Sequence, residues 1–350
     1  MKIQVGVLGV GYWGRKIVEE WSAIPNVKVR AVSDLSDKNL EQARDRYGVE
    51  GLFHDYREVL AIPDIKAVNV CLPNALHFPA CKEALEKGKH VLVEKPMTLT
   101  TEEGTQLVEL AERKNLTLSV GHIYRFNNAL AEIRRLIKER FFGRVFLLEM
   151  EWTNLEQPFS DRDVIVDLAP HYFDIINYLM DEWPVKVTCV AKPFRRKELE
   201  ETAYIVSEMA SGAVSHATLS WLSPKKVRQI SVIGENRSAY IDAVAQEIMI
   251  YESGYTYRLG VERNNTIRTE LMHFLQSIGD PMTETRNSGV IGLKTVELIE
   301  IVKESLKNGR SMVVSFYLGR RDPGSSQRPS RRLWPTGGRR GSFQDRATPS

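Results

Sequence analysis

The chain has 350 residues, of which 43% are hydrophobic and 27% are charged, and its formal net charge is +3 at pH 7. This composition is typical of a water-soluble globular protein large enough for two domains, and no apolar run is long enough to span a membrane. Residues 319–350 contain eight Arg and two Asp, so the rest of the chain is mildly acidic. We therefore expect neither a nucleic acid nor a membrane as partner.

The end of the chain differs in composition from the rest. Residues 319–350 are rich in Pro, Gly, Ser and Arg without periodicity, which predicts a disordered basic tail. A tail that binds RNA or phosphate and a non-native extension are the alternatives. The three cysteines (Cys71, Cys81 and Cys189) and the scattered histidines lack metal-ligand spacing, so we expect no metal ion. Sparse cysteines and a strand that begins at Ile3, leaving no room for a signal peptide, favour the cytoplasm.

A glycine-rich turn follows the first predicted strand, Ile3–Leu8. Gly9, Gly11 and Gly14 form a G-x-G-x-x-G pattern, and an amphipathic helix follows. In a dinucleotide-binding turn the first glycine permits the tight turn and the second lets the backbone approach a pyrophosphate. The third lets helix and strand pack closely, and the helix N-terminus presents free amides to the phosphates.

The second predicted strand, Val27–Ser33, ends at Asp34, twenty residues after Gly14. A dinucleotide fold places there the carboxylate that binds the adenosine ribose diol. A carboxylate repels a 2′-phosphate and no Arg follows directly, so NAD is favoured over NADP. A glycine-rich turn with an unrelated surface Asp is the alternative.

Strands and helices alternate as far as residue 121. This order predicts a doubly wound parallel sheet, a Rossmann domain, over residues 1–121. The further helices are expected at 36–47, 55–60, 77–87 and 100–114, and the further strands at 67–71, 90–93 and 116–120.

After residue 121 the pattern changes to successive strands joined by short turns. Residues 122–318 are therefore predicted to form an α+β domain on a mostly antiparallel, open-faced sheet. We expect its bare face, with Ile230, Val232 and Ile241, to pack on a second subunit. Strands are expected at 144–152, 185–191, 202–209, 213–221, 229–234 and 238–242, and helices at 127–140, 170–180, 266–278 and 288–307.

Polar residues follow the ends of the predicted parallel strands, where ligands bind in such sheets. They include Pro73-Asn74 with His77, Glu94-Lys95-Pro96, and Arg125; the second domain adds Asp167, His171 and Asp174. Together with the glycine turn, these motifs resemble the Gfo/Idh/MocA family of NAD(P)-dependent oxidoreductases over residues 1 to about 317. GHIYRFNN and DLAPH look most like the branch that oxidises C3 of UDP-N-acetyl amino sugars.

The resemblance implies a catalytic set. Lys95 corresponds to a lysine that contacts the reacting oxygen, where a cation stabilises developing negative charge. His171 corresponds to the general acid/base. Asp167 would orient His171 from the entry loop, since Pro170 is best placed at the first helical position; Asp174 could serve instead. Ala169 departs from the family's usual glycine, which leaves the substrate contacts open.

The resemblance also implies the surroundings of the cofactor and substrate. Arg125 could pair with a substrate phosphate or carboxylate, or be a solvated helix-entry residue. The remaining expected contacts belong to the cofactor cleft: Pro73 near the nicotinamide, Asn74 and His77 along the cleft, Glu94 on Lys95 or the nicotinamide ribose, and Tyr12 and Trp13 over the pyrophosphate.

These features predict an NAD-dependent oxidoreductase that oxidises a secondary hydroxyl of a sugar or nucleotide sugar. C3 of a UDP-N-acetylhexosamine is the favoured position, and a homodimer or homotetramer is expected from the resemblance. The alternatives are an inositol-type polyol dehydrogenase, a glycoside hydrolase that oxidises its substrate transiently with bound NAD, and a non-catalytic NAD(H) sensor.

Overall fold

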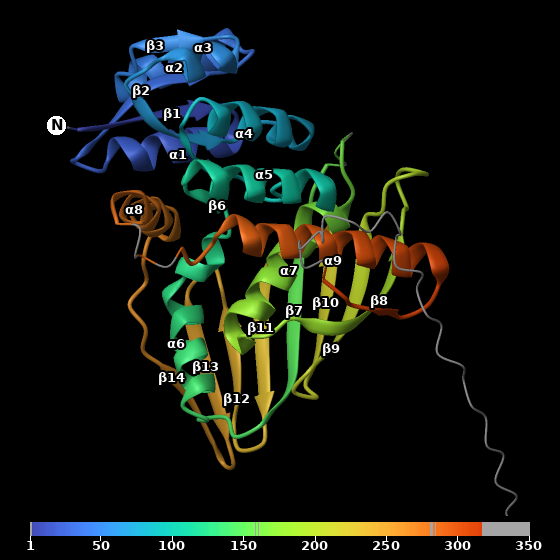
Figure 1. The fold of residues 1–350 in the computed structure, drawn as a ribbon. Coiled ribbons are helices and arrows are strands. Elements are labelled where there is room, and N and C mark those ends of the chain that lie inside the picture. The colour runs from blue at the N-terminus through green and yellow to red at the C-terminus, as the bar shows by residue number, and fades with distance from the viewer. Residues whose placement is uncertain (1, 158, 160, 281–282, 284, 317–350) are drawn as a thin grey trace, which may run out of the picture. The chain divides into compact units, whose positions relative to one another are not determined.

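The computed structural model describes residues 2–157, 159, 161–280, 283 and 285–316, and it contains two β-sheets (Figure 1). The first sheet is parallel throughout, in the order β3-β2-β1-β4-β5-β6. This confirms the predicted doubly wound sheet, although the short strand β3 was not predicted. The strands are β1 (Ile3–Leu8), β2 (Val27–Ser33), β3 (Gly51–Phe53), β4 (Ile65–Val70), β5 (His90–Val93) and β6 (Leu118–Val120).

Local sequence signals define the helices that alternate with these strands. The side chain of Thr100 accepts from the amide of Glu103 at the start of α5, and Gly48 ends α2 in the left-handed region with φ 67°. Such capping is the reason why these boundaries could be predicted. The helices are α1 (Tyr12–Ser22), α2 (Asp37–Tyr47), α3 (Tyr56–Ala61), α4 (His77–Glu86) and α5 (Thr101–Lys114).

The second sheet has the order β14-β13-β12-β11-β7-β10-β9-β8-β15. Among the pairs that the structure describes, β7 and β10 run parallel and the others run antiparallel. The predicted mostly antiparallel sheet is confirmed; β13 to β15 were not predicted. The strands are β7 (Val145–Leu155), β8 (Pro184–Lys192), β9 (Thr202–Met209), β10 (Val214–Ser220), β11 (Leu222–Gly234), β12 (Ser238–Asp242), β13 (Glu247–Glu252), β14 (Tyr255–Leu259) and β15 (Met312–Val313).

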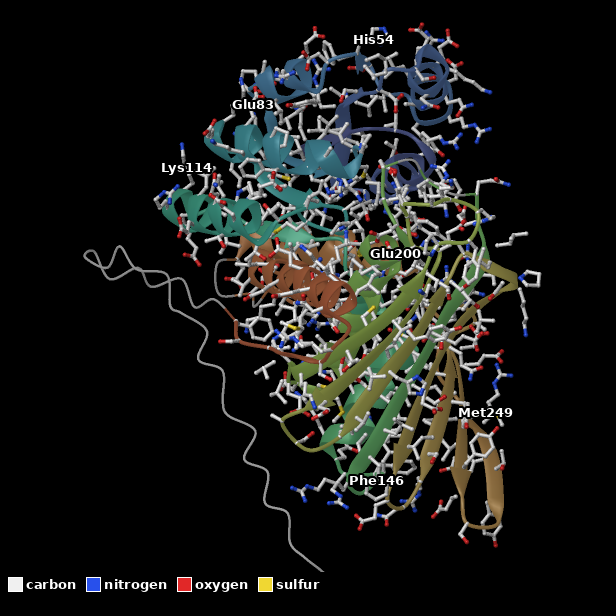
Figure 2. The ribbon with its side chains drawn as sticks, turned by 90° about the vertical axis from the view of Figure 1, so that its right-hand side faces the viewer. His54, Glu83, Lys114, Phe146, Glu200 and Met249 are labelled. Carbon is white, nitrogen blue, oxygen red and sulfur yellow. The ribbon has the colours of Figure 1, made fainter. Side chains whose placement is uncertain are left out.

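The two faces of this sheet differ. Helices lie on one face, and Figure 2 shows the strands from a side where no helix of the described residues lies in front. In β9, Tyr204 and Val206 are exposed on the uncovered face while their neighbours are buried. The expectation that Ile230, Val232 and Ile241 lie on the bare face is wrong. All three belong to the buried core, because the alternation of each strand turns them toward the helices.

The remaining helices are α6 (Asn128–Lys138), α7 (Val164–Met180), α8 (Thr266–Gly279) and α9 (Gly289–Asn308). None of the helices in the described part of the chain is long and apolar enough to cross a membrane. The predicted start of α7 at Pro170 is wrong, because Asp163 caps the helix six residues earlier by accepting from the amide of Val166 at 2.8 Å. Asp167 consequently lies in the first turn of α7 rather than in a loop.

Helices α8 and α9 return to the first sheet after the second sheet is complete (Figure 1). Leu271 and Phe274 of α8 are fully buried in one core with Val7 and Trp21, and Val296 of α9 belongs to the core around β5 and α5. The chain therefore crosses between the two halves more than once. The predicted disordered tail lies outside the described residues.

Candidate active site

The glycine turn between β1 and α1 has the geometry that a dinucleotide requires. Gly9 has φ +84°, and a Cβ on Gly14 would lie 1.9 Å from the carbonyl oxygen of Gly9. A Cβ on Gly11 would meet no described atom within 4 Å, so this side of the turn is open. Gly11 is also the N-cap of α1 and has no side chain to bond the first amides of the helix. Open space beside free amides fits a pyrophosphate group.

Asp34 lies at the end of β2, beside this turn. Its carboxylate accepts from the amide of Val10 at 2.9 Å and from Ser36 and Asn39 at 2.9 and 3.0 Å. These bonds fix the carboxylate next to the glycine turn, where the ribose diol of NAD would lie. The residues therefore fit the cofactor that the sequence predicts.

Lys95, just after β5, contacts Asp167 in the first turn of α7. Its Nζ donates to Oδ1 of Asp167 at 3.0 Å and to the carbonyl oxygen of the same residue at 2.7 Å. Pro170 has no N–H for the carbonyl of Val166, so this turn of α7 is already short of one helical hydrogen bond. Lys95 bonds the next carbonyl along, that of Asp167, so the backbone and the side chain of one residue both hold its ammonium.

Asp167 is held as an anion. Burial raises its pKa, but the charge and hydrogen bond of Lys95, together with Arg162 and Trp221, outweigh burial and leave the pKa below its ordinary value. Trp221 Nε1 donates to Oδ2 at 3.3 Å. Both carboxylate oxygens thus face Lys95 and Trp221 rather than the ring of His171, so Asp167 positions the lysine.

His171 lies one turn further along α7, among aromatic rings. Its ring centroid is 5.3 Å from that of Tyr124 and 6.0 Å from that of Trp152. Burial lowers the pKa of His171 well below its ordinary value, and the positive charges of Lys95 and Arg228 lower it further. A neutral imidazole near an ammonium can accept a proton from a hydroxyl that the ammonium polarises.

Arg125 and Asp174 contact each other inside the protein. Arg125 Nε donates to Asp174 Oδ1 at 2.5 Å, and its Nη2 donates to Asn177 at 2.7 Å. Only 6% of Arg125 and 1% of Asp174 is exposed, so the guanidinium is neither solvated nor free for a substrate phosphate. His122 lies 3.8 Å from Asp174, and burial lowers its pKa to about 4. These residues form a buried polar cluster whose members stabilise one another.

Glu94 is half-buried next to Lys95. It accepts from the indole nitrogen of Trp13, and a Cβ on Gly121 would lie 2.9 Å from its Oε2. Burial raises the pKa of Glu94 to about 7, although Lys95 and Trp13 partly oppose the shift. Trp13 therefore ties the glycine turn to the lysine loop, whereas Tyr12 is 72% exposed.

Pro73, Asn74 and His77 follow β4, as the sequence predicts, but they differ in their contacts. The two ring nitrogens of His77 lie 2.8 Å from the carbonyl oxygens of Leu72 and Pro96, so His77 joins the loops after β4 and β5. Asn74 Nδ2 is buried without a partner among the described residues, which leaves a donor for a ligand in the cleft. Pro73 precedes the short turn that presents Asn74.

Comparison with known proteins agrees with this geometry. Residues 3–122 match the model of the oxidoreductase family with an NAD-binding Rossmann fold, and residues 130–240 match the model of the C-terminal domain of the same family. The chain belongs to the Gfo/Idh/MocA family. Residues 3–122 are therefore an NAD-binding Rossmann fold.

Relatives in the Gfo/Idh/MocA family include enzymes that act on sugars and polyols. The chain is 29% identical to UDP-N-acetylglucosamine 3-dehydrogenase of Acidithiobacillus ferrooxidans over 72% of this chain and 78% of the relative. It is 23% identical to myo-inositol 2-dehydrogenase of Thermotoga maritima over 91% and 100%. A solved structure of the Acidithiobacillus dehydrogenase superposes with a TM-score of 0.79 at 25% identity, over 88% of this chain and 99% of that one.

Arg228 is a site residue that the sequence did not indicate. It lies on β11 with its guanidinium 5.3 Å from the Trp152 ring, and it donates to the carbonyl of Thr153 and to Asn154. It also hydrogen-bonds Tyr124, whose pKa burial nevertheless raises to about 12. No motif marks Arg228, because β11 reaches the site only through the order of the second sheet. The available signal in the sequence was the pair Trp152 and Trp221 at the ends of two predicted strands, since Arg228 packs against Trp152.

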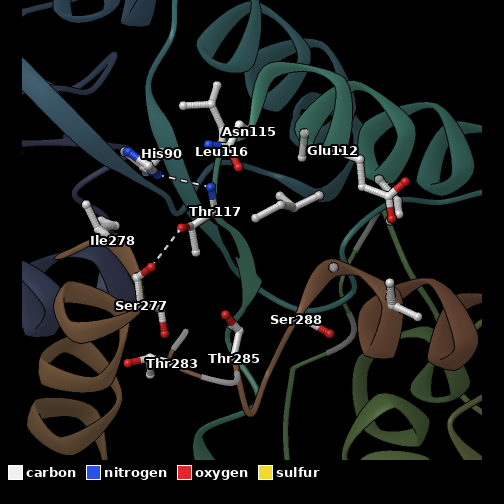
Figure 3. A pocket seen from close by; sticks show the side chains of 15 residues that line it. His90, Glu112, Asn115, Leu116, Thr117, Ser277, Ile278, Thr283, Thr285 and Ser288 are labelled. Carbon is white, nitrogen blue, oxygen red and sulfur yellow. Dashed lines mark hydrogen bonds between the residues drawn. The ribbon is translucent and has the colours of Figure 1, made fainter. Parts of the chain in front are cut away.

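A separate cavity lies at the opposite ends of the parallel strands. It measures about 530 Å³ and is lined at the amino ends of β5 and β6, where His90 accepts from the amide of Thr117 at 3.0 Å (Figure 3). Ser277 of α8 and Ser288 before α9 complete its wall. Lys95 and Asp34 follow carboxyl ends of strands, so this cavity is not part of the family's site.

Proposed function

We propose that this protein is an NAD-dependent dehydrogenase that oxidises a secondary hydroxyl of a sugar or nucleotide sugar, with C3 of a UDP-N-acetylhexosamine as the favoured position. The observation that carries the proposal is the ammonium of Lys95, held by Asp167, in the same site as the neutral imidazole of His171. Similarity to a UDP-N-acetylglucosamine 3-dehydrogenase and to an inositol dehydrogenase supports it.

Each side chain has a role that follows from its contacts. Bound NAD, held by the glycine turn, Asn74 and Asp34, supplies a hydride acceptor. Lys95 donates to the substrate oxygen and stabilises the negative charge that develops there, and Asp167 positions the ammonium. His171 accepts the hydroxyl proton, which its depressed pKa allows because the ring is neutral at pH 7.

The aromatic residues and the NAD preference belong to the same proposal. The rings of Tyr124, Trp152 and Trp221 keep water away from the reacting carbon. With less water present, Lys95 stabilises the negative charge on the substrate oxygen more strongly. Asp34, fixed by three hydrogen bonds, would repel the 2′-phosphate of NADP, so the proposed cofactor is NAD.

The experiment is a turnover assay at 340 nm with NAD and a panel of UDP-N-acetylglucosamine, inositols and free hexoses. We expect NADH from at least one polyol, and loss of about 10²-fold or more in kcat for Lys95→Met and for His171→Asn. Wild-type protein that binds NAD but forms no NADH with any of these substrates would indicate a sensor. Product release without net NADH would indicate the hydrolase that oxidises its substrate transiently.

We also propose that two or four copies assemble through the uncovered face of the second sheet. Tyr204, Val206 and Tyr240 lie exposed on it, and such a face is commonly covered by a second subunit. Light scattering of the wild type should give a dimer or tetramer, and Val206→Asp should lower the mass. A monomeric wild type would contradict the assembly.

A further inference from the structure

A second hollow adjoins the site on the side of β11. It has a volume of about 370 Å³, and its lining includes four cationic side chains and one carboxylate, Asp242. We call the four cations, Lys225, Lys226, Arg228 and Arg263, the basic pocket. The catalytic mechanism proposed above uses none of these four residues as a proton donor or acceptor.

The protein balances the charge of the basic pocket only in part, through the carboxylates of Asp167 and Glu156 near Arg228. No carboxylate among the described residues forms an ion pair with any of the four cations. Asp242, the acidic residue of the lining, instead accepts from the amides of Val244 and Ala245 at 2.8 Å each, in a turn. Four cations without an ion-pair partner around a hollow favour a ligand with more than one negative charge.

Local backbone geometry gathers these cations. In the pairing of β11 with β7, Leu222 lies opposite Leu155 and Val227 lies opposite Thr153. Four residues of β11 (223–226) therefore face a single residue of β7 and bulge out of the sheet. Lys225 and Lys226 lie on this bulge and are exposed, whereas Arg228 is half-buried. A bulge of this kind redirects side chains toward a neighbouring site.

The basic pocket lies beside the proposed reaction site. Arg228 lines it and also packs 5.3 Å from the Trp152 ring, which is itself 6.0 Å from the ring of His171. On the other side, Lys226 lies near enough to Tyr12, at the glycine turn, for its positive charge to help lower the pKa of the Tyr12 hydroxyl. A ligand bound here would thus lie beside the reacting sugar and close to the cofactor turn.

We propose that the basic pocket binds the diphosphate of the substrate, so that the substrate is a nucleoside diphosphate sugar rather than a free polyol. This inference rests on the proposed function, whose reaction it leaves unchanged. Arg125, which the sequence offered as a partner for a substrate phosphate or carboxylate, is instead buried against Asp174. Arg228 keeps most of its donors on Thr153, Val227, Asn154 and Tyr124, so it contributes positive charge at the pocket wall. The exposed cations Lys225, Lys226 and Arg263 supply the donors that bond the phosphate oxygens.

The test measures binding of UDP, uridine and inorganic pyrophosphate by calorimetry to the full chain saturated with NAD. Lys226→Met and Arg263→Met each remove one exposed cation, and Lys114→Met, at the far end of α5 (Figure 2), is the matched control. We expect each pocket variant to weaken UDP and pyrophosphate about fivefold to tenfold and uridine less than twofold. The control should bind all three as the wild type does.

Two outcomes would overturn the proposal. Wild-type protein that binds UDP no more tightly than uridine has no diphosphate subsite. Pocket variants that weaken NADH instead of UDP assign the cations to the cofactor's pyrophosphate. Because binding is measured without turnover, a failed subsite leaves the 340 nm assay unaffected, and a failed dehydrogenase assay leaves the UDP comparison interpretable.

Discussion

The half-buried carboxyl of Glu94 makes the stability of the protein depend on pH in a defined direction. Its pKa is raised from an ordinary 4.5 to about 7, so the folded state keeps a proton that the unfolded state loses between these values. The wild type therefore loses stability as pH rises from 4.5 to 7, and the loss levels off above 7. At about 1.4 kcal/mol per pKa unit, the full loss is about 3 kcal/mol.

Glu94→Gln removes this titration and keeps an oxygen for the indole of Trp13. Urea unfolding of NAD-free protein, followed by circular dichroism, should show equal free energies of unfolding for variant and wild type at pH 4. At pH 8 the variant should be more stable by about 3 kcal/mol. Glu86→Gln, on the exposed end of α4, should show no such difference. If the difference in free energy of unfolding between Glu94→Gln and wild type is the same at pH 8 as at pH 4, the raised pKa of Glu94 is refuted.

Three further predictions concern the cofactor turn and the base. Gly11→Ala should leave the melting temperature within about 2 °C but weaken NAD at least tenfold, whereas Gly14→Ala should unfold or strongly destabilise the protein, as thermal melts with and without NAD would show. Asp34→Ser should raise the KM for NAD about tenfold and reduce the ratio of kcat/KM for NAD to kcat/KM for NADP. If that ratio is unchanged, Asp34 does not bind the adenosine ribose. Arg228→Met removes a cation that lowers the pKa of His171, so the acidic limb of the kcat/KM profile should move to higher pH; a shift to lower pH would contradict the assignment of His171 as base.

The parts of this protein that could be predicted from sequence are those governed by local rules. The glycine turn, the cap at Thr100, the helix stop at Gly48, and the polar residues at strand ends all lie within a few residues of the feature that they determine. Asp34 was found in the same way, from its spacing to Gly14. Local rules also gave the alternation of the first sheet, since each βα unit carries its own periodicity.

The errors arose where distant contacts decide the structure. Pro170 is a favourable first helical residue, yet Asp163 caps α7 earlier, and Lys95 from the first domain bonds Asp167 in the first turn. Arg125 is used up by Asp174, 49 residues away in the chain. Arg228 enters the site because β11 pairs with β7, which no spacing in the sequence reveals.

The packing of α8 against the first sheet limits how the chain can be truncated and how far its two halves can move relative to each other. Leu271 and Phe274 fill the same interior as Trp21 of the helix that begins at the glycine turn. A fragment ending at residue 121 would present that interior to water and should aggregate, so deletion of the later segments is not a route to an isolated coenzyme module. The same shared interior restrains the two halves from swinging apart freely, and coenzyme release would then proceed without wide separation of the lysine from the imidazole.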